Sequence, residues 1–216
     1  MSERLYSMMV VPDERSCGLI KDLVDDIYYN NDQEKINPRS NFPHISLGKV
    51  FYSKSNDFDK RISGWLEMQE PFSFGLNKVD DFSSRTIYLT SSSKDQISEI
   101  RDLGFGVRKI MSEKSYGGFT PHLTLMDSLR KDRTKMIKGK ISKELEKVRI
   151  NLRVESVLVR EKDGARRWKN LSSFDIGGGK KIYDFRDTSW IDGHSISELP
   201  PGFFRPAVPL LYADKK

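Results

Sequence analysis

Two short stretches of the chain, Phe42-Pro43-His44-Ile45-Ser46-Leu47 and Thr120-Pro121-His122-Leu123-Thr124-Leu125, share one pattern. In each stretch a proline precedes a histidine, and an apolar residue, a hydroxyl residue and a second apolar residue follow. Only three histidines occur in the 216 residues, and the third, His194, stands in a different context. The repeat predicts two lobes that are related by pseudo-symmetry, each contributing one strand to a shared site.

Strand geometry gives the repeated pattern a physical meaning. Successive side chains of a strand point to opposite faces, so each histidine shares a face with its hydroxyl neighbour, Ser46 or Thr124. The intervening apolar residues point to the other face, toward a core. The proline before each histidine holds the preceding residue in an extended conformation. Each strand is therefore expected to present an imidazole and a hydroxyl toward a cleft.

Two imidazoles and two hydroxyls in one cleft suit phosphodiester chemistry. One neutral histidine can accept a proton from an attacking hydroxyl or water, while the other, protonated, donates one to the leaving oxygen. The hydroxyls can donate hydrogen bonds to the non-bridging phosphate oxygens and hold the phosphorus in line. His44 and His122 are therefore the candidate acid–base pair, Ser46 and Thr124 the candidate phosphate ligands, and the scheme requires no metal or cofactor.

Two rival chemistries use the same residues less well. The histidines could bind zinc with a carboxylate, but serine and threonine are poor zinc ligands. Cys17 could act as a nucleophile with a histidine, but it lies at a predicted helix start with no signature around it.

Composition excludes several classes of protein. The 37 Lys and Arg against 31 Asp and Glu give a net charge of +6, and 37% of the residues are hydrophobic, enough for a folded core. The mean hydropathy is −0.59, and the longest apolar stretches, such as 8–11, fall far short of a membrane span. The N-terminus does not resemble a signal peptide, and one cysteine excludes a disulfide framework. We therefore expect a cytoplasmic protein that makes no membrane contact.

Hydrophobic periodicity predicts an alternation of helices and short strands. Helices are expected at 14–31, 58–68, 97–111 and 129–148. Strands are expected at 8–11, 45–52, 72–79, 86–90, 122–126, 150–159 and 171–176. The remaining segment, 177–216, contains four of the nine prolines and has no clear period, so it is expected to be an extended or irregular appendage.

Basic residues form two clusters in the second half of the chain. The first consists of Arg130, Lys131, Arg133, Lys135, Lys138, Lys140 and Lys143, and the second of Arg160, Lys162, Arg166, Arg167 and Lys169. Each cluster is either a solvated face or a surface that attracts polyanions such as nucleotides or RNA.

With both motifs in hand, the chain resembles the 2H phosphoesterase superfamily, the LigT-like group defined by two His-x-Ser/Thr motifs, here PHISL and PHLTL. The resemblance covers about residues 1–176 and leaves 177–216 outside. It implies an α+β fold, bilobal and pseudo-symmetric, in which two small antiparallel sheets line a central cleft and the helices lie outside. It also implies that His44 and His122 are catalytic and that Ser46 and Thr124 bind phosphate.

The resemblance further implies a metal-independent phosphodiesterase acting on an RNA-like or small oligonucleotide substrate. Activities in the family include opening 2′,3′-cyclic phosphates, cleaving 2′,5′-oligoadenylates, trimming RNA 3′ ends and, in phages, destroying cyclic oligonucleotide immune signals. A viral or phage source, and hence a host cytoplasm, is compatible with this. The bacterial branch often has a basic residue shortly after the second motif, where this chain has Met126 and Asp127. The alternative is a non-catalytic nucleotide- or RNA-binding module on the same fold.

Three further residues are candidates for substrate contacts. Tyr6 stands where the family often places an aromatic residue at the cleft, Tyr116 could stack on a base, and Arg160 could reach a phosphate. Core packing, a surface position and a solvated charge are the respective structural alternatives. We expect a monomer whose partner is an oligonucleotide or an RNA end, with the segment 177–216 available for protein contacts.

Overall fold

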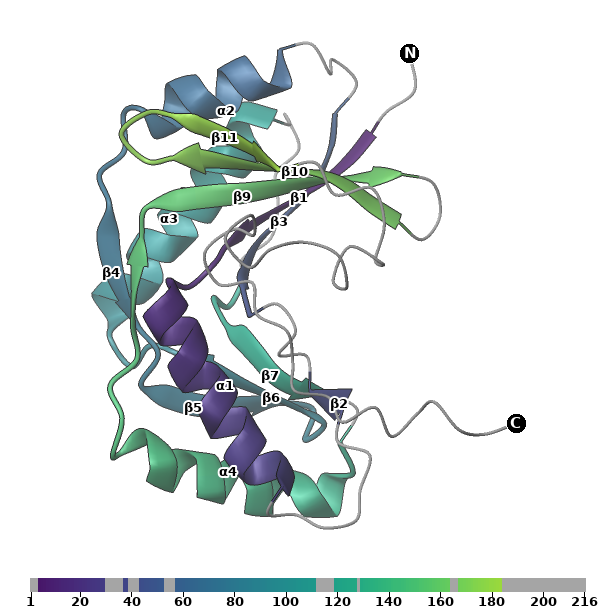
Figure 1. The fold of residues 1–216 in the computed structure, drawn as a ribbon, viewed down its shortest axis with the longest axis vertical. Coiled ribbons are helices and arrows are strands. Elements are labelled where there is room, and N and C mark those ends of the chain that lie inside the picture. The colour runs from purple at the N-terminus through teal and green to yellow at the C-terminus, as the bar shows by residue number, and fades with distance from the viewer. Residues whose placement is uncertain are drawn as a thin grey trace.

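Nine strands form one antiparallel sheet that curves through the whole molecule (Figure 1). The structure, a computed structural model, describes residues 4–29, 37–38, 43–52, 57–111, 119–127, 129–163 and 167–183. The strand order is β11-β10-β9-β1-β3-β7-β6-β5, with β2 paired to β7. The bounds are β1 Arg4–Val10, β2 Asn37–Pro38, β3 Ile45–Tyr52, β5 Lys78–Phe82, β6 Thr86–Thr90, β7 Leu123–Asp127, β9 Ser156–Asp163, β10 Arg167–Asp175 and β11 Lys180–Tyr183.

The sheet consists of two halves that meet at one point. An upper half contains β11, β10, β9, β1 and β3, and a lower half contains β7, β6, β5 and β2. The described residues of β3 and β7 pair only at Ile45 and Leu123, which belong to the two repeated motifs. The predicted α+β fold with two small antiparallel sheets is thereby confirmed, and the sheets are continuous through this pair.

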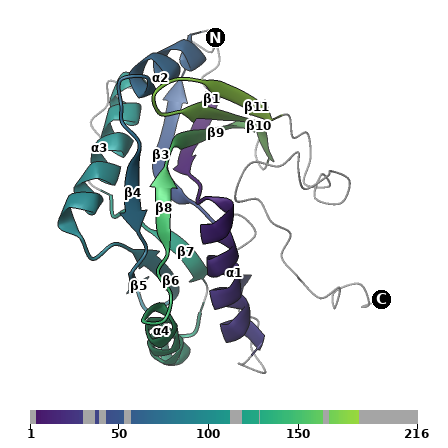
Figure 2. The ribbon, with the colours of Figure 1, turned by 60° about the vertical axis from the view of Figure 1, so that its left-hand side comes forward.

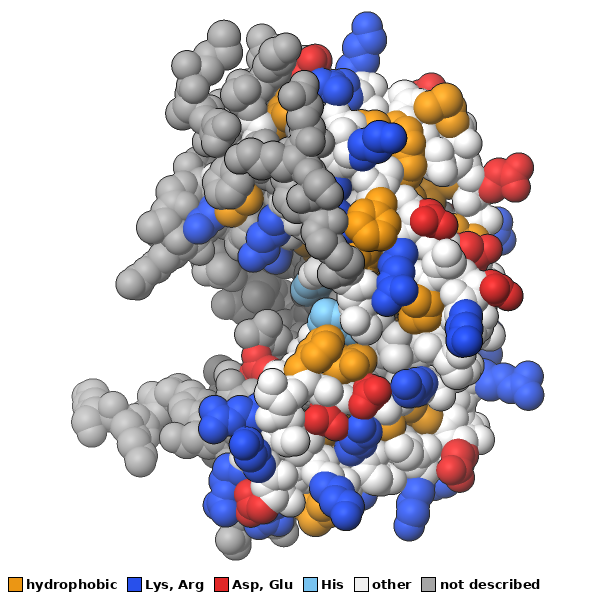
Figure 3. Space-filling model, turned by 180° about the vertical axis from the view of Figure 1, so that it is seen from behind, with side chains coloured by type: hydrophobic (Ala, Val, Ile, Leu, Met, Phe, Trp, Pro, Cys, Tyr) orange, Lys and Arg blue, Asp and Glu red, His pale blue; other side chains and the backbone are white. Residues whose placement is uncertain are grey.

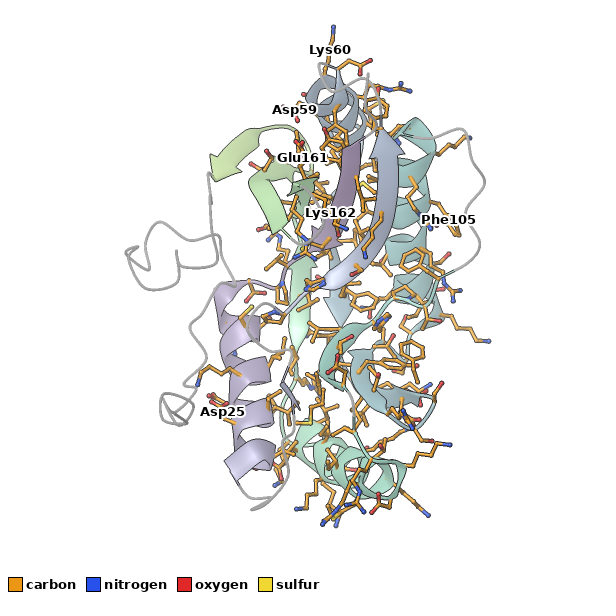
Figure 4. All side chains as sticks on the ribbon, turned by 90° about the vertical axis from the view of Figure 1, so that its right-hand side faces the viewer. Asp25, Asp59, Lys60, Phe105, Glu161 and Lys162 are labelled. Carbon is orange, nitrogen blue, oxygen red and sulfur yellow. The ribbon has the colours of Figure 1, made fainter. Side chains whose placement is uncertain are left out.

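Four helices cover the outer sides of the described structure: α1 Glu14–Tyr29, α2 Phe58–Leu66, α3 Lys94–Met111 and α4 Lys131–Leu145. Helix α3 packs on β3 and α2 in the upper half, whereas α4 packs on β5, β6 and α1 in the lower half. Figure 4 shows α1, marked by Asp25, and α3, marked by Phe105, on opposite flanks. Helix α3 follows β6 of the lower half but packs in the upper half. Helix α1 follows β1 of the upper half but packs on α4 in the lower half.

A second, two-stranded sheet carries the chain between the halves. Strand β4, Phe72–Gly75, leads from α2 in the upper half to β5 in the lower half, and β8, Asn151–Val154, leads back from α4 to β9. The two strands are antiparallel: Phe72 pairs with Val154 at one end, and Gly75 pairs with Asn151 at the other (Figure 2). The backbone N–H and C=O groups of β4 and β8 therefore form hydrogen bonds with each other where the chain passes between the halves.

The core lies between the sheet and the helices, where the repeated motifs contribute their apolar residues. Ile45, Leu47 and Leu123 are 0% exposed and Leu125 is 1% exposed. The predicted apolar faces of the helices are also buried, as in α3 at Ile100, Leu103 and Val107. The described helices are too short or too polar to cross a lipid bilayer.

Two glycines inside α3 permit close packing against neighbouring rings. A Cβ atom added at Gly106 would overlap the indole of Trp65 in α2, and one at Gly104 would lie 2.8 Å from the ring of Phe119. Glycine lowers intrinsic helix stability, but here it lets two rings approach the helix backbone.

Several predicted strand boundaries differ from the structure. The strand predicted over 150–159 is two strands, β8 and β9, which belong to different sheets. The single strand predicted over 72–79 is two strands, because the backbone N–H of Leu76 donates to Ile150 O and that of Asn77 to Thr90 O, so the chain changes partners there. Strand β11 pairs with β10 and extends the sheet past residue 176 into the predicted appendage. Residues 184–216 lie outside the described residues, and their role stays a prediction.

Candidate functional site

The two histidine motifs lie side by side where the halves meet. His44 directly precedes β3 and His122 directly precedes β7, and the next residues, Ile45 and Leu123, form the joining pair. The two strands are antiparallel, so a step forward along one strand lies opposite a step back along the other. This register sets Ser46 across from His122. The pale-blue histidine side chains lie next to each other on the surface (Figure 3).

The burial pattern confirms which face of the sheet carries the polar groups. Ile45 and Leu123 are fully buried in the core, whereas His44, Ser46, His122 and Thr124 each keep some exposure to solvent. The predicted alternation of an apolar and a polar face is therefore present in both strands.

One hydrogen bond determines which nitrogen of His122 is available for chemistry. Its Nδ1 lies 2.7 Å from the carbonyl oxygen of Thr120. A carbonyl oxygen only accepts hydrogen bonds, so Nδ1 carries a proton and donates it. Nε2 is then the nitrogen that accepts or donates a proton during a reaction.

An aromatic wall, formed by Phe82 and Tyr88, borders His122. The two rings stack with centroids 4.2 Å apart, and they meet the imidazole edge-on at 4.9 Å and 5.2 Å respectively. Tyr88 is buried whereas Phe82 is 37% exposed. Burial, followed by the charge of Asp80, raises the pKa of the Tyr88 phenol above its ordinary value. Sequence reasoning missed both residues, because only the strand register places them beside His122.

A strained turn holds Phe82 in place. Ser83 and Ser84, the two residues after it, both have φ of 52°, a conformation that costs free energy for residues other than glycine. The turn is fixed from two sides: the N–H of Ser84 donates to Asp81 Oδ1 (3.0 Å), and Thr134 Oγ1 donates to the Ser84 carbonyl (2.7 Å). Positive φ at both central residues is typical of the type I′ turn that joins hairpin strands, and the N–H of Arg85 closes this turn by donating to Phe82 O (3.0 Å).

A β-bulge shapes the upper half of the site. Met9 pairs with Ser46 but Met8 pairs with Gly48, so Leu47 is an extra residue in β3. Gly48 has φ of +141°, and a Cβ there would lie 2.7 Å from Arg108 Cδ, so glycine is required. The bulge shifts the alternation, and Lys49 lies on the same face as Ser46.

Arg160 lies on the histidine face. Ser7 pairs with both Lys49 and Arg160, and paired residues point to the same side of a sheet. Arg160 is half-buried, and desolvation lowers the pKa of its guanidinium. The structure therefore brings Arg160 to the face of the candidate site.

The structure places Tyr6 elsewhere, which corrects its assignment to the cleft. Tyr6 alternates with Ser7 and points to the opposite face, where its ring stacks on Phe58 of α2 at a centroid distance of 3.9 Å. Its 6% exposure shows that it packs in the core. Cys17 is also buried, and its thiol contacts the carbonyl of Pro12. Tyr116 and His194 lie outside the described residues.

The first basic cluster lies on the outer surface. Its residues belong to α4 and its start, and this helix packs on the opposite face of β5 and β6 from the histidines. Lys138 donates to Asp80 and Asp81 at 2.7 Å and 2.8 Å. Lys138 therefore ties this helix to β5 through ion pairs.

The family model of the 2′-5′ RNA ligase superfamily matches residues 13–166, which include both histidine motifs. The chain belongs to this superfamily. The 2H phosphoesterase resemblance is thus confirmed. No protein with a curated description matches the chain.

Solved structures of E. coli LigT share the fold. The apo form is 14% identical with a TM-score of 0.54, covering 86% of this chain and 96% of LigT. LigT complexed with 3′-AMP is 14% identical with a TM-score of 0.52, covering 86% of this chain and 97% of LigT. At this identity the likeness establishes the fold, and the chemistry of this superfamily member is argued from its own residues.

Proposed function

We propose that this protein is a metal-independent phosphodiesterase that cleaves an RNA-like or small oligonucleotide substrate by general acid–base catalysis. The observation that carries the proposal is the junction of the two sheets. It sets two His-x-Ser/Thr motifs on one face, with each histidine across from the other motif's hydroxyl. Membership of the 2′-5′ RNA ligase superfamily supports the same class of chemistry.

In this mechanism each histidine acts through one of its own two ring nitrogens. One imidazole removes the proton from an attacking water or ribose hydroxyl, whose oxygen forms a bond to phosphorus. The other imidazolium donates its proton to the leaving oxygen as the old P–O bond breaks. The Ser46 and Thr124 hydroxyls donate to the non-bridging oxygens, where negative charge increases in the transition state. For His122 the acting nitrogen is Nε2, because Nδ1 is held by Thr120.

The preferred substrate is a small nucleotide-type molecule: a 2′,5′-oligoadenylate, a cyclic oligonucleotide or a 2′,3′-cyclic phosphate. LigT, which shares the fold, has been crystallised with 3′-AMP, and the exposed ring of Phe82 beside His122 would suit a base. Cleavage of such molecules would allow the protein to counteract immunity signalled by nucleotides in a host cell.

The decisive experiment incubates the protein with a panel of these substrates and with 3′,5′-oligoadenylate as reference. We expect turnover of at least one member that persists in EDTA and is lost in His44→Ala and His122→Ala. Activity that disappears with EDTA, or survives both substitutions, would contradict the mechanism. Binding without product on every member would favour the non-catalytic module.

A further inference from the structure

Basic side chains follow one strip of the histidine face, in the upper half only. Beginning at Ser46 and moving away from the histidines, the strip meets Lys49 and Arg160, and then Lys162 two residues further along β9. One row of paired residues contains Met9 and Ser46, and the next contains Ser7, Lys49 and Arg160. The described strand positions of these two rows include no acidic residue. In Figure 4, Lys162 lies over the strands of the upper half, whereas Lys60 projects from the outer end of α2.

Among the described residues, the lower half of the same face carries acidic side chains instead. Asp80 pairs with Tyr88 of the aromatic wall and lies 3.4 Å from Lys78. Asp127, at the end of β7, adds another acidic position on this side. The described strand positions of this face therefore carry carboxylates in the lower half and lysine and arginine in the upper half.

The spacing of the strip follows from the sheet itself. Met9 pairs with Ser46, and Ser7, two residues back along β1, pairs with both Lys49 and Arg160. Two residues of a strand span about 7 Å. This is comparable to the distance between successive phosphates of a nucleotide chain, so a phosphate at Ser46 and its neighbour would meet consecutive rows.

The two basic side chains of the second row have complementary properties, and Ser7 between them is 3% exposed. The half-buried guanidinium of Arg160 offers a planar pair of donors that matches phosphate oxygens. Its desolvation makes a bound anion more favourable than it would be for a solvated arginine. Lys49 is exposed and adds charge at the rim.

We propose that Lys49 and Arg160, which flank the buried Ser7 in one row of the sheet, form a second phosphate-binding subsite, one row away from the phosphate that is cleaved. The substrate class that fits is an oligonucleotide with at least one phosphate beyond the scissile one, in preference to a cyclic mononucleotide. Lys162 lies further along the strip, where a third phosphate would reach it. The proposal rests on the proposed function only for the position of the first phosphate.

The test measures binding in the His44→Ala/His122→Ala variant, in which turnover is blocked. The ligands are fluorescently labelled oligoadenylate dinucleotides, 2′,5′- or 3′,5′-linked, with no terminal phosphate, a 5′-phosphate or a 3′-phosphate. We expect one terminal phosphate to tighten binding about 10-fold to 100-fold, as charge-assisted hydrogen bonds do. In the same background, Arg160→Gln and Lys49→Gln should each remove most of this gain. Each should also lower the salt dependence of log Kd by about 0.7.

The matched control is Lys60→Gln, which removes the same charge from an exposed position on α2 and should preserve the gain. Should Arg160→Gln fail to fold, the exposed Lys49 decides alone. Equal affinity for all the dinucleotides, or a gain that survives both substitutions, would overturn the subsite. Failure of the proposed function is a separate result, since it appears as no turnover by the unmodified protein whatever the binding data show.

Discussion

At the scale of single residues, the two histidines predict a specific dependence of rate on pH. Because one imidazole must be neutral and the other protonated, kcat/KM should follow a bell whose two limbs report the macroscopic constants of the pair. Ser46→Ala and Thr124→Ala should each lower the rate by about 10²-fold to 10³-fold without moving the bell, since hydroxyls do not titrate in this range. Rate measurements on a cleavable dinucleotide across pH test this. A rate that keeps rising with pH would indicate hydroxide as the nucleophile.

Phe82 is the residue whose substitution should change substrate binding most selectively. If its ring stacks on a base, Phe82→Ala should raise KM by about 5-fold to 100-fold, while Phe82→Tyr retains the stack. The control is Phe105→Ala, which removes a comparably exposed ring (38%) from α3. An equal effect of both alanine variants would argue against a base contact.

At the scale of elements, α3 packs closely on α2 because Gly106 has no side chain. Gly106→Ala should destabilise the fold, because its Cβ would overlap Trp65, although alanine is the better helix former. Gly139→Ala in α4 is the matched control: nothing lies within 4 Å of the added Cβ, so a gain of up to about 1 kcal/mol is expected. Free energies of unfolding from urea titration should therefore change in opposite directions.

The contact of α4 with β5 should make stability depend on pH. The hydrogen bond from Lys138 lowers the pKa of Asp80 below 3.8, so this contribution is present above that value and is lost as pH falls through the folded pKa. Asp80, and then Asp81, raise the pKa of Lys138 above 10.5, so its contribution is lost as pH rises through the folded pKa. Lys138→Met should cost about 1 kcal/mol or less at pH 7, because the pair is partly exposed.

Urea titrations at several pH values test this contact. The difference between Lys138→Met and the unmodified protein should shrink at both extremes of pH. Lys143→Met, exposed on the same helix, should show no such dependence. A cost that is constant from acid to neutral pH would mean that the ion pair does not stabilise the fold.

At the scale of the whole molecule, the pair Ile45 and Leu123 joins the two halves of the main sheet in the described structure. Ile45→Ala should cost about 2–5 kcal/mol of stability, as does Ile62→Ala, since both residues are 0% exposed. Under conditions where both variants are fully folded, only Ile45→Ala should lower kcat, because small displacements of catalytic groups reduce rates strongly. Equal kcat in the two variants would show that the junction does not position the site.

Local chemistry was sufficient to predict much of this protein. The repeated Pro-His-apolar-hydroxyl-apolar pattern indicated two strands, their polar and apolar faces and the family, because alternation along a strand depends only on neighbouring residues. The helices were predicted within a few residues by their periodicity. What these signals share is that they do not depend on how distant segments pair.

Strand pairing and bulges in the tertiary structure decided which side chains share a face of the sheet and which lie next to the histidines. Sequence alternation would place Lys49 on the face opposite Ser46, and only the bulge at Leu47 brings the two together. Phe82 and Tyr88 reach His122 through the register of three strands, and Tyr6 turns into the core because its alternation follows Met8 and Val10. Register arises from contacts between residues far apart in the chain, so no local pattern in one sequence contains it.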